Sequence, residues 1–272
     1  MKISDQFRAV SARKGGFIVN IAIAILAITF VVLVTVDQYS KRHRTSVPSI
    51  AKSSGITLPG VNWNNKSETL VAFVTERSTE SSANVRFYQR LQLALKDHQD
   101  LAFVAAFPDP FDNIDRFLSS NNLSGLQSVH ASVKDAHVDA IPTLLLVSNS
   151  GEVLDVWPGE LGRVRQEQVL DRVGLHDPGL SPDWLMSPES LKELTAHSAV
   201  TLLDVRDRAN FKNSHVDGSI NIPLDELPVR AINELDPKSV IALDGRTLDP
   251  NVLDLADMKL AKSGFERVVI IR

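Results

Sequence analysis

The stretch from Phe17 to Val36 constrains this chain more than any other, because its twenty residues carry no charged side chain. As an α-helix rising about 1.5 Å per residue, it would cross a hydrocarbon core of roughly 30 Å. A cleaved signal peptide is the alternative, but the run exceeds a signal core and leads into Lys41-Arg42-His43-Arg44 instead of a small-residue cleavage site. We therefore predict a basic tail (1–16), one transmembrane helix (17–36) and a linker (37–60).

One face of this predicted helix combines an amide with small side chains. Asn20, Ala24 and Ala27 follow one another at spacings of four and three residues. Small residues let a second helix approach closely, and an amide can form a hydrogen bond across such a contact. The same alanines could equally face lipid, so a helix–helix contact is one of two interpretations.

Charge is distributed unevenly along the chain. Residues 1–44 carry a net charge of +5, whereas the whole chain carries −4, so the remainder carries −9. An acidic soluble part argues against nucleic acid as a partner, and the basic flanks suit contacts with the lipid bilayer. Positive charges on the two flanks balance, but a short tail before a large C-terminal part favours a single-pass protein of the cell inner membrane with periplasmic domains.

The chain contains no cysteine. It therefore has no disulfide, no thiolate nucleophile and no Cys-ligated metal. Its histidines show no metal-ligand spacing either, so we expect neither a metal site nor a cofactor.

Between residues 61 and 173 apolar runs of strand length alternate with segments of helical spacing. This alternation predicts an α/β fold with a central sheet that is buried on both faces. We expect strands at 69–74, 101–107, 141–147 and 152–157, and helices at 81–95, 112–120 and 166–173.

The same region resembles the thioredoxin-like family, most specifically through Ile141-Pro142-Thr143 before a strand that ends at a Gly151 turn. The resemblance implies a cis peptide at Pro142 and a redox motif at Thr75, Glu76, Arg77 and Ser78. Neither end of that motif is cysteine, and a hydroxyl can neither attack nor resolve a disulfide, so redox activity is excluded. Two uses remain open: a scaffold in which Ser78 or Thr79 caps the helix, and the binding of a peptide or protein in the groove beside Pro142.

A short Gly- and Pro-containing linker (174–183) leads to a second domain at 184–272. Ser187-Pro188 is typical of a helix start, and 199–205 and 239–243 are predicted strands. The run that begins at the first of these strands resembles the rhodanese-like family. The matching residues are Asp204, Arg206, Phe211, His215, Gly218, Asn221 and Pro223.

Asp244 occupies the position at which that family carries its nucleophilic cysteine. A carboxylate cannot carry a persulfide, so the resemblance implies a fold without sulfur transfer or the related cysteine phosphatase activity. We expect Asp244 to be an exposed loop carboxylate, with hydrolase chemistry at Asp244 as a remote alternative. Arg206 and His215 are expected to order the strand and loop around them.

These patterns predict a non-enzymatic, membrane-anchored accessory or scaffold subunit. It would bind and stabilise a larger membrane complex, respiratory or photosynthetic, with other membrane protein subunits as partners. The alternative is an assembly factor or chaperone that uses the groove near Pro142. The fold class is α/β: a transmembrane helix, a thioredoxin-like domain and a rhodanese-like domain.

Overall fold

The computed structural model describes residues 55–75, 78–108, 113–134, 136–175 and 182–272. The predicted tail, the transmembrane segment with Asn20, Ala24 and Ala27, and residues Glu76 and Arg77 lie outside this range. Within the described residues no helix is both long and apolar enough to cross a bilayer.

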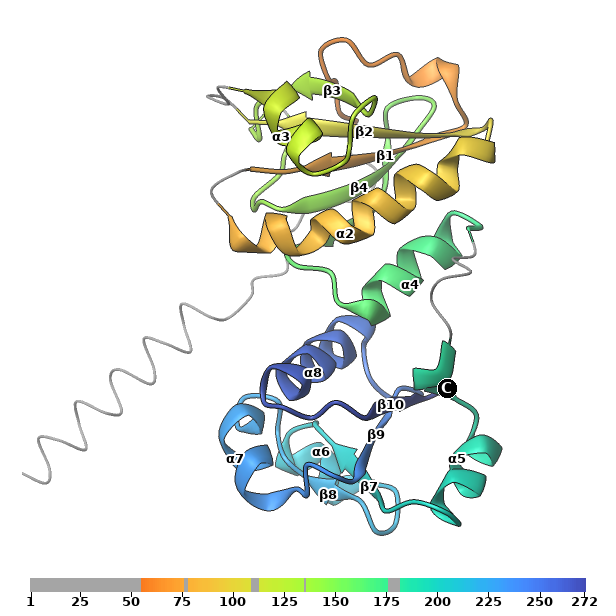
Figure 1. Cartoon of the computed structure of the whole chain (residues 1–272), viewed down its shortest axis with the longest axis vertical. Helices are drawn as coiled ribbons and strands as arrows, with labels where there is room; N and C mark the ends of the chain where they lie inside the picture. Colours follow the sequence, from red (N-terminus) through yellow and green to blue (C-terminus); the bar gives the residue numbers. More distant parts are fainter. Residues whose placement is uncertain (1–54, 76–77, 109–112, 135, 176–181) are drawn as a thin grey trace, which may run out of the picture. The chain divides into compact units, whose positions relative to one another are not determined.

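The first domain is built on a mixed sheet of five strands (Figure 1). The strands lie in the order β3-β2-β1-β4-β5, with β1 parallel to β2 and antiparallel to β4. The elements are η1 (Trp63–Asn65), β1 (Glu68–Phe73), α2 (Thr79–Ala94), η2 (Leu95–Asp97), β2 (Leu101–Phe107), α3 (Ile114–Ser120), β3 (Gln127–His130), β4 (Thr143–Ser148), β5 (Val153–Pro158) and α4 (Arg163–Arg172).

Both faces of this sheet are covered, because successive side chains of a strand point to opposite faces. In β1, Leu70 and Ala72 pack with residues of α2, α3 and α4 on one face. Val71 and Phe73 pack on the other face against Ile56 and the loop that contains Val138. The near-continuous apolar runs in the sequence result from this two-sided burial.

The second domain has a parallel sheet in the order β6-β10-β9-β7-β8 (Figure 1). Its outermost strands, β6 and β8, are two residues long each. The elements are η3 (Pro182–Trp184), β6 (Leu185–Met186), α5 (Pro188–Thr195), β7 (Val200–Asp204), α6 (Arg208–Asn213), β8 (Ile220–Asn221), α7 (Leu227–Glu234), β9 (Val240–Asp244), α8 (Pro250–Lys262) and β10 (Val268–Ile271).

Most of the elements expected from sequence are present, with shifted ends. The helix expected at 112–120 spans Ile114–Ser120, and the one expected at 166–173 spans Arg163–Arg172. Strand β3 and helices α7 and α8 were not anticipated. Of these three elements, α8 helps to form the junction between the domains, because it contacts α4 of the first domain.

Helices α4 and α8 join the two domains inside one compact unit, which includes the described residues from Gly55 onward. The carboxylate of Asp254, on α8, accepts hydrogen bonds from the backbone N–H groups of Gly162 (2.9 Å), Val164 (3.1 Å) and Arg165 (3.2 Å). A helix N-terminus leaves such N–H groups without intrahelical partners, and Gly162, the N-cap of α4, has no side chain to offer. Asp254 therefore caps α4 from the other domain.

The same carboxylate forms a buried ion pair with Arg165. Nε of Arg165 lies 3.1 Å from Oδ2 of Asp254, and the two side chains are 9% and 2% exposed. The guanidinium also donates to the carbonyl oxygens of Pro158 (2.8 Å) and Glu160. Burial raises the pKa of Asp254, although Arg165 and the N–H groups favour its ionised form. The pair is therefore compensated by hydrogen bonds on both sides.

Apolar and aromatic contacts surround this pair. Val164 of α4 is fully buried in the main core of the second domain. Beside it, Arg163 makes a bidentate pair with Asp257 (2.8 and 2.5 Å) and lies over the ring of Trp184 at 4.7 Å. The first domain thus contributes a side chain to the core of the second.

Candidate functional site

The redox-motif position of the first domain is occupied by structural hydroxyls. Ser78 is the N-cap of α2, and its Oγ accepts a hydrogen bond from the N–H of Ser81 (3.2 Å); it is one of the two caps that the sequence left open, Ser78 or Thr79. The N–H of Thr75 donates to Oγ of Ser81 (3.3 Å), which lies in a buried residue. These contacts stabilise the start of α2 and leave Ser78 committed to helix capping.

The Ile141–Pro142 peptide is cis, as the thioredoxin resemblance implies. The carbonyl of Pro142 accepts a hydrogen bond from the N–H of Gly159 (2.7 Å), and Oγ1 of Thr143 donates to the carbonyl of Ala140 (2.7 Å). Pro142 is buried, whereas Ile141 is half-buried. The loop before β4 is therefore fixed on both sides of the proline.

A more enclosed site lies in the second domain, where the carboxyl ends of β7, β9 and β10 meet. This cavity of about 390 Å³ has an apolar lining that includes Leu191, Leu202, Ala242 and Ile271. Polar side chains from the ends of the strands and the loops after them complete it. They are Asp204, Arg206, Ser214, His215, Ser219, Asp244, Arg246 and Thr247.

Arg206 and His215 order the loops around this cavity. Arg206 donates to both carboxylate oxygens of Asp204, at 2.5–3.1 Å, and to the carbonyl of Ser214 at 2.7 Å. The His215 ring stacks on Phe211 with centroids 4.1 Å apart, and its Nδ1 lies 2.9 Å from the Phe211 carbonyl oxygen. Both residues thus make the ordering contacts expected from the sequence.

Asp244 differs from the exposed loop carboxylate that the sequence suggested. Its side chain is only 20% exposed and forms an ion pair with Arg246, two residues later. Hydrogen bonds from Arg246, and the more distant charge of Arg206, hold the pKa of Asp244 below its usual range. A carboxylate that is ionised throughout the neutral range cannot act as a general acid and is a weak base.

The loop after Asp244 serves to start α8. Oδ1 of Asp249 accepts hydrogen bonds from the backbone N–H (2.8 Å) and the side-chain amide (2.9 Å) of Asn251. Asp249 is therefore an N-cap, with Pro250 in the first turn of the helix. Within the described residues no group of three or more histidine, aspartate or glutamate side chains is arranged to hold a metal ion.

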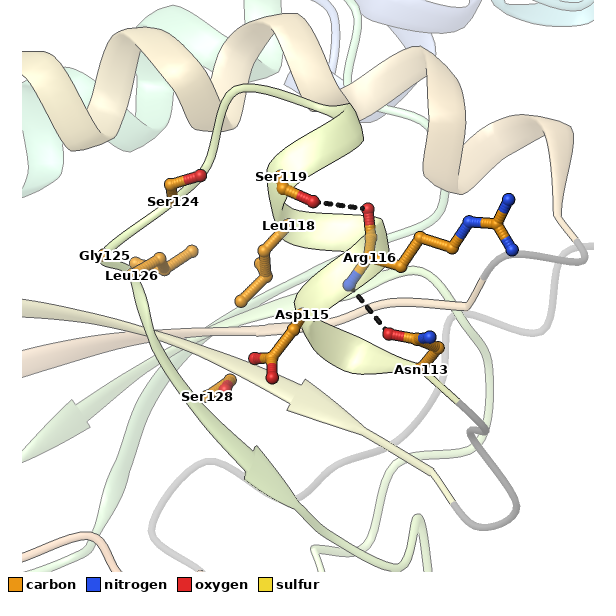
Figure 2. A pocket seen from close by; sticks show the side chains of 9 residues that line it. All are labelled: Asn113, Asp115, Arg116, Leu118, Ser119, Ser124, Gly125, Leu126 and Ser128. Carbon is orange, nitrogen blue, oxygen red and sulfur yellow. Dashed lines mark hydrogen bonds between the residues drawn. The ribbon is translucent and has the colours of Figure 1, made fainter.

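A larger, open hollow lies beside α3 in the first domain (Figure 2). Asn113 Oδ1 accepts a hydrogen bond from the N–H of Arg116 (2.9 Å), and Ser119 Oγ donates to the Arg116 carbonyl (3.1 Å). Figure 2 shows the Arg116 side chain extending away from Leu118 and Leu126. These polar contacts are local to α3, so we place the candidate site in the cavity of the second domain.

Sequence reasoning identified Asp244, Arg206 and His215 but not Arg246 as a partner. A signal for it was present: Asp-x-Arg occurs twice, at 204–206 and at 244–246, each time directly after an apolar strand. In both places the arginine folds back on the aspartate two residues before it. Each Asp-x-Arg segment thus contributes an ion pair to the lining of the cavity.

Comparison with known proteins covers the two domains separately. Residues 187–272 match the rhodanese-like domain family. YrkF of Bacillus subtilis (strain 168), named as a candidate sulfur carrier protein, is 30% identical over 87 residues, which make up 31% of this chain and 44% of that protein. The chain thus spans less than half the length of this curated relative.

Solved structures with similarity to the chain fall into two groups. The rhodanese-like domain of the Anabaena sp Alr3790 protein is 28% identical, with a TM-score of 0.30, over 33% of this chain and 68% of that one. StoA from Bacillus subtilis is 19% identical, with a TM-score of 0.35, over 46% of this chain and 99% of that one. The second domain is thus similar to rhodanese-like domains over residues 187–272, and the α/β domain before it contains the cis-proline implied by the thioredoxin resemblance.

Proposed function

We propose that this chain is a non-catalytic, membrane-anchored scaffold subunit of a larger membrane complex, with its two α/β domains on the periplasmic side of the inner membrane. One observation carries the proposal: the positions at which the two resembled families hold reactive cysteine are occupied by side chains that make internal contacts. Ser78 caps α2, and Asp244 is paired with Arg246. Shape and position are then what the chain can contribute.

The name of the relative YrkF describes a sulfur carrier. Carrying sulfur as a persulfide requires a cysteine thiol, and this chain has no cysteine. The proposal therefore takes only the domain type from that relative.

The predicted transmembrane helix supplies both the anchor and a candidate contact. Its uncharged length supports the anchor, and the face formed by Asn20, Ala24 and Ala27 supports close packing against a helix of another subunit. A respiratory or photosynthetic complex is the proposed host.

The direct test is purification of the native chain from membranes in mild detergent. We expect it to co-migrate at constant stoichiometry with other membrane subunits and to be released when Ala24 and Ala27 are both replaced by leucine. The matched control replaces Ala22 with leucine, which also enlarges a small residue and preserves hydrophobicity but lies on the opposite face of the predicted helix. Migration of the native chain alone as a monomer would contradict the proposal.

A second candidate is an assembly factor that holds a peptide beside Pro142, where the half-buried Ile141 leaves part of the loop before β4 accessible. This role predicts substoichiometric association that depends on the stage of assembly. Constant stoichiometry in the finished complex argues against it.

For the remote hydrolase alternative, unchanged function of an Asp244→Asn variant would exclude a nucleophilic role.

A further inference from the structure

The cavity of the rhodanese-like domain lies where parallel α/β sheets commonly bind ligands, at the carboxyl ends of their strands. Its volume of about 390 Å³ is within the usual range for small-molecule sites. The chemical class that it can accept depends on which of its polar groups are free to make new hydrogen bonds.

Asp244 already uses the donors of its own loop. Its Oδ1 accepts from the backbone N–H (3.1 Å) and from Nε (2.9 Å) of Arg246, and its Oδ2 accepts from Nη2 of the same residue (2.9 Å). Two parallel hydrogen bonds from one guanidinium are also how a free carboxylate or phosphate would be bound. The aspartate thus takes the place that an oxyanion would take on Arg246.

The second guanidinium at the cavity is committed in the same way. Arg206 makes its bidentate contact with Asp204 and also donates from Nη2 to the Ser214 carbonyl. Asp204 and Asp244 therefore balance the charges of Arg206 and Arg246. A free anion entering the cavity would therefore meet no net positive charge from these two pairs.

We propose that Asp244 is a tethered anion that occupies the oxyanion position of its own loop. In the native chain it makes the cavity select against sulfate- and phosphate-like ligands. When its carboxylate is removed, the same loop binds such an oxyanion through the guanidinium and backbone N–H of Arg246. This inference does not depend on the scaffold role, which is tested by co-purification.

The test titrates the full-length chain in detergent with inorganic sulfate and with inorganic phosphate, at ionic strength held constant with chloride, by calorimetry. The Asp244→Ala variant is expected to bind sulfate at least about tenfold more tightly than the native chain, since a charge-assisted bidentate contact contributes more than about 1.4 kcal/mol. Adding Arg246→Ala to this variant should abolish the gain. Lys238→Ala serves as a matched control for the loss of a cation that does not line the cavity.

Three results would overturn the inference. One is a folded Asp244→Ala variant that binds sulfate no better than the native chain. Another is a native chain that already binds sulfate as tightly as the Asp244→Ala variant does. The third is a gain that persists without Arg246. If Asp244→Ala does not fold, as judged by circular dichroism, Asp244→Asn decides, because it removes the charge and keeps the shape. The asparagine variant must then bind sulfate more tightly than the native chain.

Discussion

At the scale of single residues, Asp254 is the most deeply buried of the charged side chains that join the two domains. It lies almost completely buried, yet four N–H groups from Gly162, Val164 and Arg165 point at its two oxygens. A buried carboxylate is tolerated only when it is hydrogen-bonded and paired in this way. The capping of α4 therefore depends on this one carboxylate of α8.

We expect Asp254→Ala to lower the free energy of unfolding by about 3–5 kcal/mol, because it leaves Arg165 buried without its counter-charge and α4 without its cap. Urea denaturation followed by circular dichroism measures the loss. Asp257→Ala is the control: its partner Arg163 is 29% exposed and lies over Trp184, so water can replace part of what is lost. A loss for Asp254→Ala no larger than for Asp257→Ala would contradict this account.

At the scale of secondary-structure elements, the start of α4 is shaped by the helix that caps it. Gly162 keeps an extended backbone with φ −74°, which any residue can adopt. Space is the limiting factor: a Cβ at this position would lie 2.8 Å from Cγ of Asp254. Glycine is thus required for the close approach of α8 to α4 and not for the conformation of the chain.

Gly162→Ala should therefore destabilise the protein by roughly 1–3 kcal/mol through displacement of the Asp254 carboxylate. Gly55→Ala is the matched control, since no atom lies within 4 Å of a Cβ there and its φ is not in the left-handed region. Thermal unfolding of both variants gives the comparison. Equal melting temperatures for the two would show that α8 moves away from α4 without cost.

The contrast between α2 and α8 shows what the sequence could predict. Helical spacing and Ser78 located α2 and its cap, and the apolar runs located the strands, because these signals are local. Helix α8 had the local signal Asp249-Pro250, the same pattern as Ser187-Pro188, and could have been found. The pairing of Arg165 with Asp254 could not, because it joins residues 89 positions apart and no local period shows which surfaces meet.

The candidate site divides in the same way. The resemblance singled out Asp204, Arg206, His215 and Asp244 by their order in the chain, and the structure brings all four to one cavity. The ion pair between Asp244 and Arg246 is known only from the positions of their side chains in the structure. Whether the loop after a strand turns its arginine toward the preceding carboxylate depends on burial, which a pattern of residue types does not encode.

At the scale of the whole molecule, the described residues of the two domains share a core, since Val164 of α4 is buried with Ile241 and Ile270 of the second sheet. If one domain unfolded alone, the other would expose this apolar surface, and the Arg165–Asp254 ion pair would be broken. We therefore expect the domains to unfold in one cooperative transition. Urea curves from circular dichroism and tryptophan fluorescence should coincide in the native chain. Two resolved transitions in the native chain would contradict a shared core.

The two-residue outer strands of the second sheet, β6 and β8, have a consequence for self-association. A strand edge recruits another chain through a row of unpaired N–H and C=O groups, and two residues supply too few of them. The first sheet differs, because its outer strands β3 and β5 are four and six residues long. An extended segment of another chain that adds to a sheet edge would therefore do so on the first domain, whereas the second domain is protected from edge-to-edge aggregation.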